Sequence, residues 1–282
     1  MYNEYYTFGG VTLELTGEKD WKLSDLCRPF RAEPRPADHT IHVTVGDDMP
    51  QPPEGAAHEA TLYRWREGER FCLLQDYGSR YRAFAARQGG LTEVRLSEGY
   101  RETASDRVIL ESAGLFDLLA DFGMLILHSA YIVTPQGQGL LFSGPSGAGK
   151  STQAELWRQY AGAQVINGDR SLVRPGDGTV HGILYSGTSG ICRNVSAPLR
   201  AIVLPVQGAE NRAYPLRPKE AFMALVNQCA YYPWAADSAG WLTELAAQMV
   251  NAVPVYGMDC RKGESAVRAL QDYLRRGCHE AE

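Results

Sequence analysis

Gly144-Pro-Ser-Gly-Ala-Gly-Lys-Ser-Thr152 contains the phosphate-binding pattern G-x-x-x-x-G-K-[ST]. Residues 140–142 before it, Leu-Leu-Phe, predict a short apolar strand, and residues 153–160 after it are mostly helix formers. A glycine-rich turn that merely precedes a helix rarely matches all eight positions together with both flanks. The stretch therefore predicts a nucleotide site between a strand and a helix.

Each residue type in this loop has a task. The glycines let the backbone turn its N–H groups toward phosphate oxygens. Lys150 places a positive charge on the β- and γ-phosphates, and Ser151 offers its hydroxyl to Mg²⁺. The predicted nucleotide-binding residues are Gly144, Pro145, Ser146, Gly147, Ala148, Gly149, Lys150, Ser151 and Thr152.

Composition limits the class of protein. With 282 residues and 44% apolar residues, the chain can form one large domain or two small ones. The formal net charge is −5, and no basic cluster is dense enough to contact a phosphate backbone, which argues against nucleic acid as a partner. A homo-oligomer is compatible with this composition.

The cysteines and the apolar segments indicate a cytoplasmic protein. The six cysteines are scattered without a C-x-x-C pair, and the N-terminus lacks the features of a signal peptide, so we expect reduced thiols rather than a metal site. The longest apolar stretch, Leu115 to Val133, is interrupted by Asp117 and Asp121. We therefore expect no membrane anchor.

Residues 1–104 predict a β-rich N-terminal lobe with antiparallel strands and no catalytic constellation. Glu67-Gly68 and Gly89-Gly90 are typical of hairpin turns, and the three prolines within residues 47–55 favour a surface loop. The predicted strands are Tyr5–Leu15, His39–Val45, Ala60–Arg66, Arg70–Gln75 and Arg80–Arg87.

Residues 105–282 are predicted to form the nucleotide-binding core. Apolar residues at helical spacing between Asp106 and Phe122 indicate one connecting helix. His128 to Thr134 then alternates as a strand, residues 135–139 form a turn, and the strand from Leu140 enters the phosphate loop. A hairpin therefore precedes the nucleotide site.

A carboxylate follows the helix behind the loop. Gln164-Val-Ile-Asn-Gly-Asp169 predicts a strand that ends in Asp169, the nearest candidate to share Mg²⁺ with the phosphate loop. The alternative is an aspartate that caps a turn before Arg170. The metal or catalytic role is the interpretation we favour.

Three segments together resemble HPr kinase/phosphorylase-like proteins. They are Leu127-His-Ser-Ala130, residues 141–152 and Ile166-Asn-Gly-Asp169. The resemblance covers roughly residues 105 to 260, where residues 186–190 and 198–203 also look similar. It implies a phosphoenolpyruvate carboxykinase-type P-loop kinase fold, an α/β core behind the β-rich lobe, with ATP and Mg²⁺ as cofactors.

The resemblance also implies roles for single residues. Lys150 and the loop amides would hold the ATP phosphates, Ser151 and Asp169 would serve the metal, and His128 would lie beside the transferred group. From the residues alone, a histidine on a strand is more often structural. Arg193, just beyond the glycine-containing segment 186–190, is a candidate phosphate clamp and equally an ordinary surface arginine.

The chain departs from the family at one informative position. HPr kinase-like sequences usually carry two adjacent aspartates where this chain has Gly168-Asp169, and the first is the expected base. Either Asp169 or His128 replaces it, or the loose transition state of phosphoryl transfer needs no strong base. No clear match to the segment linked to the reverse phosphorylase reaction is present, which favours a dedicated kinase.

The C-terminal third predicts packing elements. Helices are expected over Arg217–Val226, Leu242–Val250 and Ser265–Arg275, with a strand over Pro254–Met258. Residues 231–234, Tyr-Tyr-Pro-Trp, form an aromatic cluster that either packs or lines an acceptor groove.

These observations predict an ATP-dependent kinase that phosphorylates a hydroxyl. The most plausible acceptor is serine in a small protein or peptide. A free metabolite such as serine itself, and a non-catalytic protein that binds ATP as a conformational ligand, are the alternatives. Carboxykinase chemistry is disfavoured because the chain is short and lacks a recognisable set of arginines for a dicarboxylate.

Overall fold

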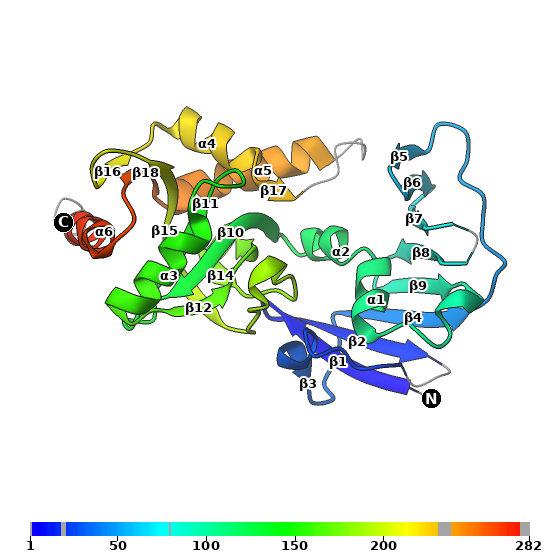
Figure 1. Cartoon of the computed structure of the whole chain (residues 1–282). Coiled ribbons are helices and arrows are strands. Elements are labelled where there is room, and N and C mark those ends of the chain that lie inside the picture. Colours follow the sequence, from blue (N-terminus) through cyan, green and yellow to red (C-terminus); the bar gives the residue numbers. More distant parts are fainter. Residues whose placement is uncertain (1, 18–20, 79, 231–237, 277–282) are drawn as a thin grey trace. The chain divides into compact units, whose positions relative to one another are not determined.

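The computed structural model describes residues 2–17, 21–78, 80–230 and 238–276. It shows a mixed α/β protein. These residues form two mixed β-sheets and six α-helices. They divide into two compact units (Figure 1): the first contains the described residues up to Phe122 together with residues 238 and 239, and the second contains residues 123–230 and 240–276. The helices between residues 105 and 122 contact the first sheet, and the domain boundary between residues 104 and 105 stays a prediction.

The first unit is built on a nine-stranded sheet with the order β3-β1-β2-β4-β9-β8-β7-β6-β5. Strand β4 is parallel to both of its neighbours, so the prediction of an antiparallel lobe was wrong at this place. The two edge strands are the shortest, which leaves little unpaired backbone at either edge. The strands are β1 (Tyr2–Phe8), β2 (Val11–Gly17), β3 (Arg31–Ala32), β4 (His39–Val45), β5 (Ala57–Glu59), β6 (Leu62–Glu67), β7 (Arg70–Asp76), β8 (Arg82–Gln88) and β9 (Leu91–Leu96).

Two predicted elements of this unit are each divided in two by glycines. The strand predicted over Tyr5–Leu15 is a hairpin, because Gly9 (φ 58°) and Gly10 (φ 87°) turn the chain between β1 and β2. The helix predicted between Asp106 and Phe122 is two short helices, α1 (Asp106–Ser112) and α2 (Leu115–Asp121). Gly114, at φ 72°, separates them in a left-handed conformation. The predicted turns at Glu67-Gly68 and Gly89-Gly90 are both present.

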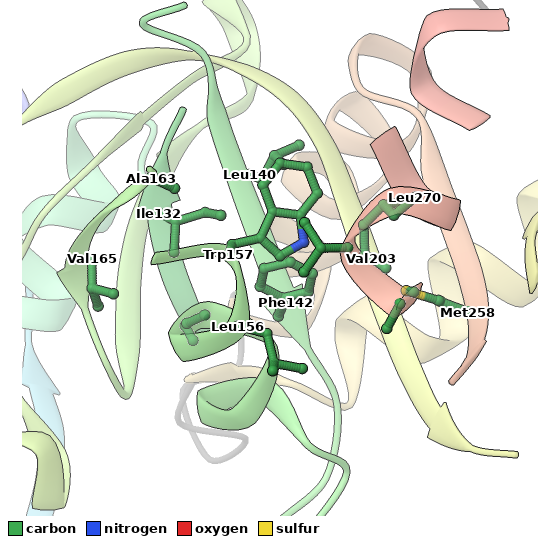
Figure 2. Packing of buried hydrophobic residues seen from close by; sticks show 14 of the residues in the cluster. Ile132, Leu140, Phe142, Leu156, Trp157, Ala163, Val165, Val203, Met258 and Leu270 are labelled. Atoms are coloured by element: carbon green, nitrogen blue, oxygen red, sulfur yellow. The ribbon is translucent and has the colours of Figure 1, made fainter. Parts of the chain in front are cut away.

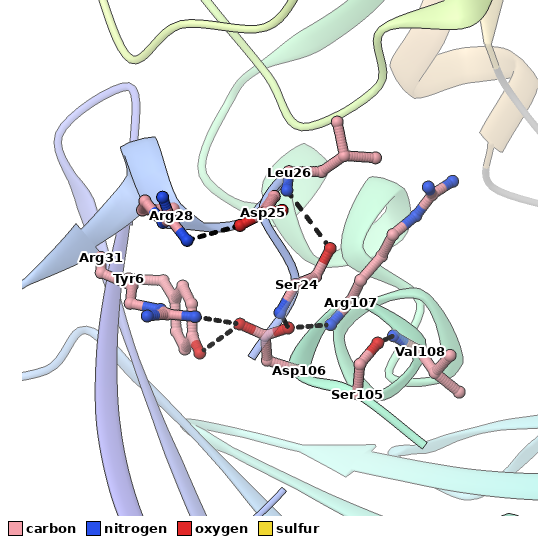
Figure 3. Close-up of polar contacts among 10 residues, drawn as sticks. All are labelled: Tyr6, Ser24, Asp25, Leu26, Arg28, Arg31, Ser105, Asp106, Arg107 and Val108. Atoms are coloured by element: carbon pink, nitrogen blue, oxygen red, sulfur yellow. Dashed lines mark hydrogen bonds and ion pairs between the residues drawn. The ribbon is translucent and has the colours of Figure 1, made fainter. Parts of the chain in front are cut away.

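A buried carboxylate connects α1 with the start of the chain. Asp106 is fully buried and accepts hydrogen bonds from the Tyr6 hydroxyl (2.9 Å) and from the backbone N–H of Ser24 (2.7 Å). The Arg31 guanidinium pairs with the same carboxylate at 3.4 Å, as Figure 3 shows. Because every oxygen is partnered, this is a structural network rather than a reactive site.

The second unit contains the other nine-stranded sheet, ordered β11-β10-β13-β14-β15-β18-β16. Strand β15 also pairs in parallel with β11, so the strands β11, β10, β13, β14 and β15 form a closed ring of pairings. The two strands outside this order, β12 and β17, both pair with β10. The strands are β10 (Leu125–Val133), β11 (Gly139–Ser143), β12 (Gln164–Asn167), β13 (Arg170–Arg174), β14 (Thr179–His181), β15 (Ser196–Gln207), β16 (Arg212–Pro215), β17 (Cys229–Ala230) and β18 (Val255–Cys260).

Two amphipathic helices cover this sheet. Helix α3 (Lys150–Ala161) and helix α6 (Glu264–Arg276) pack against each other and against β10, β11 and β16. The Trp157 indole of α3 lies among side chains from β11 and β15 in Figure 2. The buried cluster comprises Ala130, Ile132, Leu140, Phe142, Ala154, Leu156, Trp157, Ala163, Val165, Ala201, Val203, Met258, Ala266, Val267 and Leu270.

The remaining helices agree with the predicted packing elements. Helix α4 spans Pro218–Val226 and helix α5 spans Ser238–Ala252. The aromatic cluster at residues 231–234 lies outside the described residues. Within the described part of the chain, no α-helix has both the length and the hydropathy that a bilayer span requires.

Candidate functional site

The phosphate-binding pattern adopts the predicted order of strand, loop and helix. Strand β11 is buried throughout, and α3 begins directly at Lys150. Between them, Gly144 (φ 141°), Gly147 (φ 80°) and Gly149 (φ 102°) take backbone angles that other residues rarely adopt. The loop needs glycine at these positions for its backbone shape.

The start of α3 is open for an anion. Gly149 precedes the helix without any side-chain cap, and the first hydrogen bond of the helix joins Gln153 N–H to the Gly149 carbonyl. The N–H groups of the first turn consequently have no acceptor within the helix. Ser151 and Thr152 are exposed there. Such N–H groups and the helix dipole favour phosphate.

Lys150 is held inside the loop. Its side chain is buried, and Nζ donates to the Gly144 carbonyl (2.8 Å) and to the Pro145 carbonyl (3.0 Å). Burial lowers the pKa of this ammonium, while the nearby Asp169 carboxylate acts in the opposite direction. A cation that is already desolvated can exchange two neutral carbonyls for phosphate oxygens, which bind it more strongly.

Strand β10 brings the other site residues to the loop. It lies between β11 and β13, with Ser129 opposite Ser143 and His128 opposite Arg170. Two hydrogen bonds fix this corner: Ser143 Oγ donates to the His128 carbonyl (2.9 Å), and Ser129 N–H donates to the Asp169 carbonyl (3.0 Å). The predicted hairpin is confirmed, but His128 lies within the strand rather than at its start.

Asp169 lies between a histidine and an arginine. Its Oδ1 is 3.6 Å from His128 Nε2, and its Oδ2 is 3.5 Å from Arg170 Nε. The aspartate belongs to the turn between β12 and β13, not to the end of the strand as predicted. The His128 side chain is 36% exposed and that of Asp169 34%, so a ligand can reach both.

His128 is disposed to stay neutral. Burial lowers the pKa of its imidazole, and the positive charges of Lys150 and Arg170 lower it further against the opposing effects of Asp169 and Gln228. The backbone N–H of His128 also donates to the Gln228 carbonyl at 2.8 Å. A neutral imidazole beside a carboxylate can accept a proton.

The segment of residues 186–190 packs directly on the carboxylate turn. A Cβ atom on Gly187, which has φ 55°, would lie 2.6 Å from the Asp169 Cβ. Asn167 holds the preceding residues, because its buried amide donates to the Ile183 and Tyr185 carbonyls (2.9 and 2.8 Å) and accepts from Ile183 N–H (3.0 Å). Sequence reasoning missed Asn167, whose one signal was a polar residue inside an apolar strand.

The two arginines near the site differ in position. Arg193, the predicted phosphate clamp, is exposed, and its carbonyl accepts from Val195 N–H at 3.1 Å. Arg170, which the sequence marked only as the residue after Asp169, contacts the carboxylate and lies 5.8 Å from the centre of the Tyr185 ring. The structure thus brings Arg170 to Asp169, and the clamp role of Arg193 stays a prediction.

Ser151 and Asp169 are the site residues that could hold Mg²⁺. Within the described residues, no group of three or more His, Cys, Asp or Glu side chains could hold a metal ion. A hydroxyl from Ser151 and a carboxylate from Asp169 are nevertheless the oxygen ligands that Mg²⁺ prefers, and Mg²⁺ usually takes its other ligands from phosphates and water. These two residues would hold it.

The comparisons with known proteins place no constraint on these assignments. No protein-family model matches the chain, and no curated protein matches it.

Proposed function

We propose that this protein is an ATP-dependent, Mg²⁺-requiring kinase that transfers the γ-phosphate to a hydroxyl group. One observation supports this most: a buried lysine in the loop of residues 144–152 shares its electrostatic environment with His128 of strand β10 and with Asp169 of the turn before β13, and the last two side chains are 3.6 Å apart. This combination provides both a phosphate cradle and a proton acceptor. The core is of the phosphoenolpyruvate carboxykinase type in this proposal.

In the bound state, the amides of residues 144–152 and the Lys150 ammonium would hold the β- and γ-phosphates. Ser151 and Asp169 would hold Mg²⁺, which neutralises charge on the phosphate oxygens. Arg170, beside the Asp169 carboxylate, limits its orientation. Arg193 remains the candidate for a second contact with phosphate.

During transfer, the acceptor oxygen forms a bond to the γ-phosphorus while the bond to the β-phosphate oxygen breaks, and ADP leaves. The proton of the acceptor hydroxyl passes to the Asp169 carboxylate. His128, 3.6 Å away and neutral, is the alternative acceptor of that proton. A loose transition state requires only late proton removal, so one carboxylate suffices.

The exposure of the site favours a hydroxyl carried by a polypeptide. His128 and Asp169 each keep about a third of their side-chain surface exposed, so a hydroxyl on the surface of a polypeptide can reach them. Serine of a small protein or peptide is the proposed acceptor, and free serine is the alternative within the same chemistry.

A nucleotide-gated binding protein is the second candidate function. The observation that favours it is the lone carboxylate, because Gly168 supplies no side chain and Ser189 occupies the adjoining space. Such a protein would bind MgATP through the same loop without transferring phosphate.

Transfer of labelled phosphate from ATP to candidate peptides and to free serine separates these functions. We expect Asp169→Asn to lower the rate by about 10²- to 10⁴-fold, the scale of a general base, while the exposed Asp272→Asn leaves it unchanged. Equal transfer rates for wild type and Asp169→Asn would show that Asp169 is not the proton acceptor and would leave His128 as the candidate. Absence of transfer to a verified acceptor despite tight MgATP binding would establish the second candidate.

A further inference from the structure

A hollow lies at the other end of strand β11 from the loop of residues 144–152. Its volume is about 420 Å³, within the range of roughly 300–1,000 Å³ that is typical of small-molecule pockets. Its walls come from the turn between β10 and β11, from α3, from β15 and from the last turns of α6. All of these belong to the second unit.

The walls are fixed by hydrogen bonds. In the turn, Thr134 N–H donates to the Gln138 carbonyl (2.9 Å), and Gln138 N–H donates to Thr134 Oγ1 (3.3 Å). On the opposite side, Arg200 Nη2 of β15 donates to the Leu274 carbonyl of α6 at 3.0 Å. The hollow is therefore a formed feature of the fold and not a gap between mobile loops.

The lining has an apolar part and a cationic part. Leu140 and Trp157, which are 1% and 3% exposed, form the buried floor of the hollow, and the half-buried Leu274 lies beside them. The ionisable residues that line it are Arg200 and Arg275, and no carboxylate is among its described lining residues. An occupant that suits this lining has a flat apolar body and a negative charge.

Arg275 is able to turn toward such a charge. Its guanidinium is 3.6 Å from the Asp272 carboxylate, and the two side chains are 73% and 56% exposed. An ion pair so open to solvent contributes little and can be exchanged for a bound anion. Gln271, four residues earlier on α6, lies on the same helix face and adds an amide to the rim.

We infer that this hollow is a binding site for a small organic anion with an aromatic or similarly flat apolar body. The inference does not depend on the proposed kinase activity, because none of the lining residues belongs to the phosphate loop. Trp157 places the site on α3, the helix that begins at Lys150, so an occupant would contact the helix that carries the phosphate site.

The probe for the test is 8-anilinonaphthalene-1-sulfonate, which combines aromatic rings with a fixed negative charge and fluoresces in apolar surroundings. We expect saturable binding with one probe per chain that excess MgATP does not displace. Arg275→Glu should weaken it by about tenfold or more, because an attraction at contact distance becomes a repulsion. Gln271→Trp, which fills the rim, should weaken it as well.

Arg268→Glu is the matched control with the same change of charge, since Arg268 is an exposed arginine of the same helix outside the hollow. Neither test position is buried, so both variants should fold, which circular dichroism verifies. Probe affinity that is the same in wild type, Arg275→Glu and Gln271→Trp would overturn the inference. Displacement of the probe by MgATP would also overturn it, because the probe would then occupy the phosphate loop.

Discussion

Ser189 occupies the space that a side chain on Gly168 would need. A Cβ atom on Gly168 would lie 2.6 Å from the Ser189 Cβ and closer still to its Oγ. Ser189 cannot move away freely, because its Oγ donates to the Ser186 carbonyl (2.7 Å) and accepts from Ile191 N–H (3.2 Å). A hydrogen-bonded segment that contains Ser189 therefore leaves no room for a second carboxylate at position 168.

This contact predicts that Gly168→Ala destabilises the protein. Overpacking of this kind costs about 1–3 kcal/mol, and it should exceed the stabilisation that Gly→Ala gives through the unfolded state. Ser189→Gly in the same chain should recover part of the loss. Urea unfolding of the single and double variants measures both effects. Gly168→Asp should add a useful carboxylate only together with Ser189→Gly.

Gly176→Ala is the control for that comparison, because a Cβ atom there would meet no heavy atom within 4 Å. We expect its free energy of unfolding to stay near that of the wild type. If Gly168→Ala is as stable as Gly176→Ala, the packing of Ser189 against Gly168 does not restrict the position.

Lys150→Ala should separate ligand binding from folding. A ligand that binds only the native state stabilises it by about 2.7 kcal/mol at a hundredfold excess over Kd. We expect this gain from MgATP in the wild type and its loss in Lys150→Ala. The apo variant should stay folded, because removal of a desolvated cation offsets the loss of its two hydrogen bonds to carbonyls.

Thermal melts with and without MgATP test this prediction, with Lys219→Ala as the exposed-lysine control. Equal stabilisation of wild type and Lys150→Ala by MgATP would show that the loop is not the nucleotide site.

Two buried histidines predict a loss of stability in mild acid. Burial is the main cause that lowers the pKa of His39 and of His181 to about 4, from an ordinary value of 6.5. The unfolded chain therefore binds more protons below pH 6.5, and the free energy of unfolding falls as the pH falls toward 4. Each histidine should remove about 2 kcal/mol by pH 5.

The neutral rings are held by hydrogen bonds, His39 to Thr92 (2.8 Å) and His181 to Ser196 (2.7 Å). Replacement of either histidine by Gln should flatten the decrease in stability between pH 7 and pH 5, whereas His58→Gln, at an exposed position, should not. Denaturant titrations at several pH values measure the slopes. Unchanged slopes in both buried variants would contradict the prediction.

Asp106→Asn should destabilise the first unit by about 3–5 kcal/mol, the usual effect of breaking a buried charged pair. The substitution removes the negative charge that Arg31 faces and replaces one acceptor by a donor in front of Tyr6 or Ser24. Asp25→Asn is the control, because that carboxylate is 85% exposed and its ion pair with Arg28 is open to solvent. A similar loss in both variants would contradict the structural role of Asp106.

Local sequence signals predicted the elements whose shape depends on their own residues. The pattern from Gly144 to Thr152 needs its glycines for backbone angles that no partner imposes, so strand, loop and helix follow directly. The hairpin in front of the loop could also be predicted, from the alternation of apolar and polar residues and from the turn residues between its strands. Gly114 was visible too, but its left-handed conformation, which splits the predicted helix, depends on how α1 and α2 pack on the sheet.

What the sequence alone determined here is the glycine-rich loop from Gly144 to Thr152, the strand and helix on its two sides, and the presence of an aspartate after the helix. Only the tertiary structure decided that β10 places His128 3.6 Å from Asp169 and that Ser189 closes the space beside Gly168. The physical reason is range: backbone angles and helix starts are set by neighbours along the chain, whereas strand register and close contacts between segments arise from packing between distant residues.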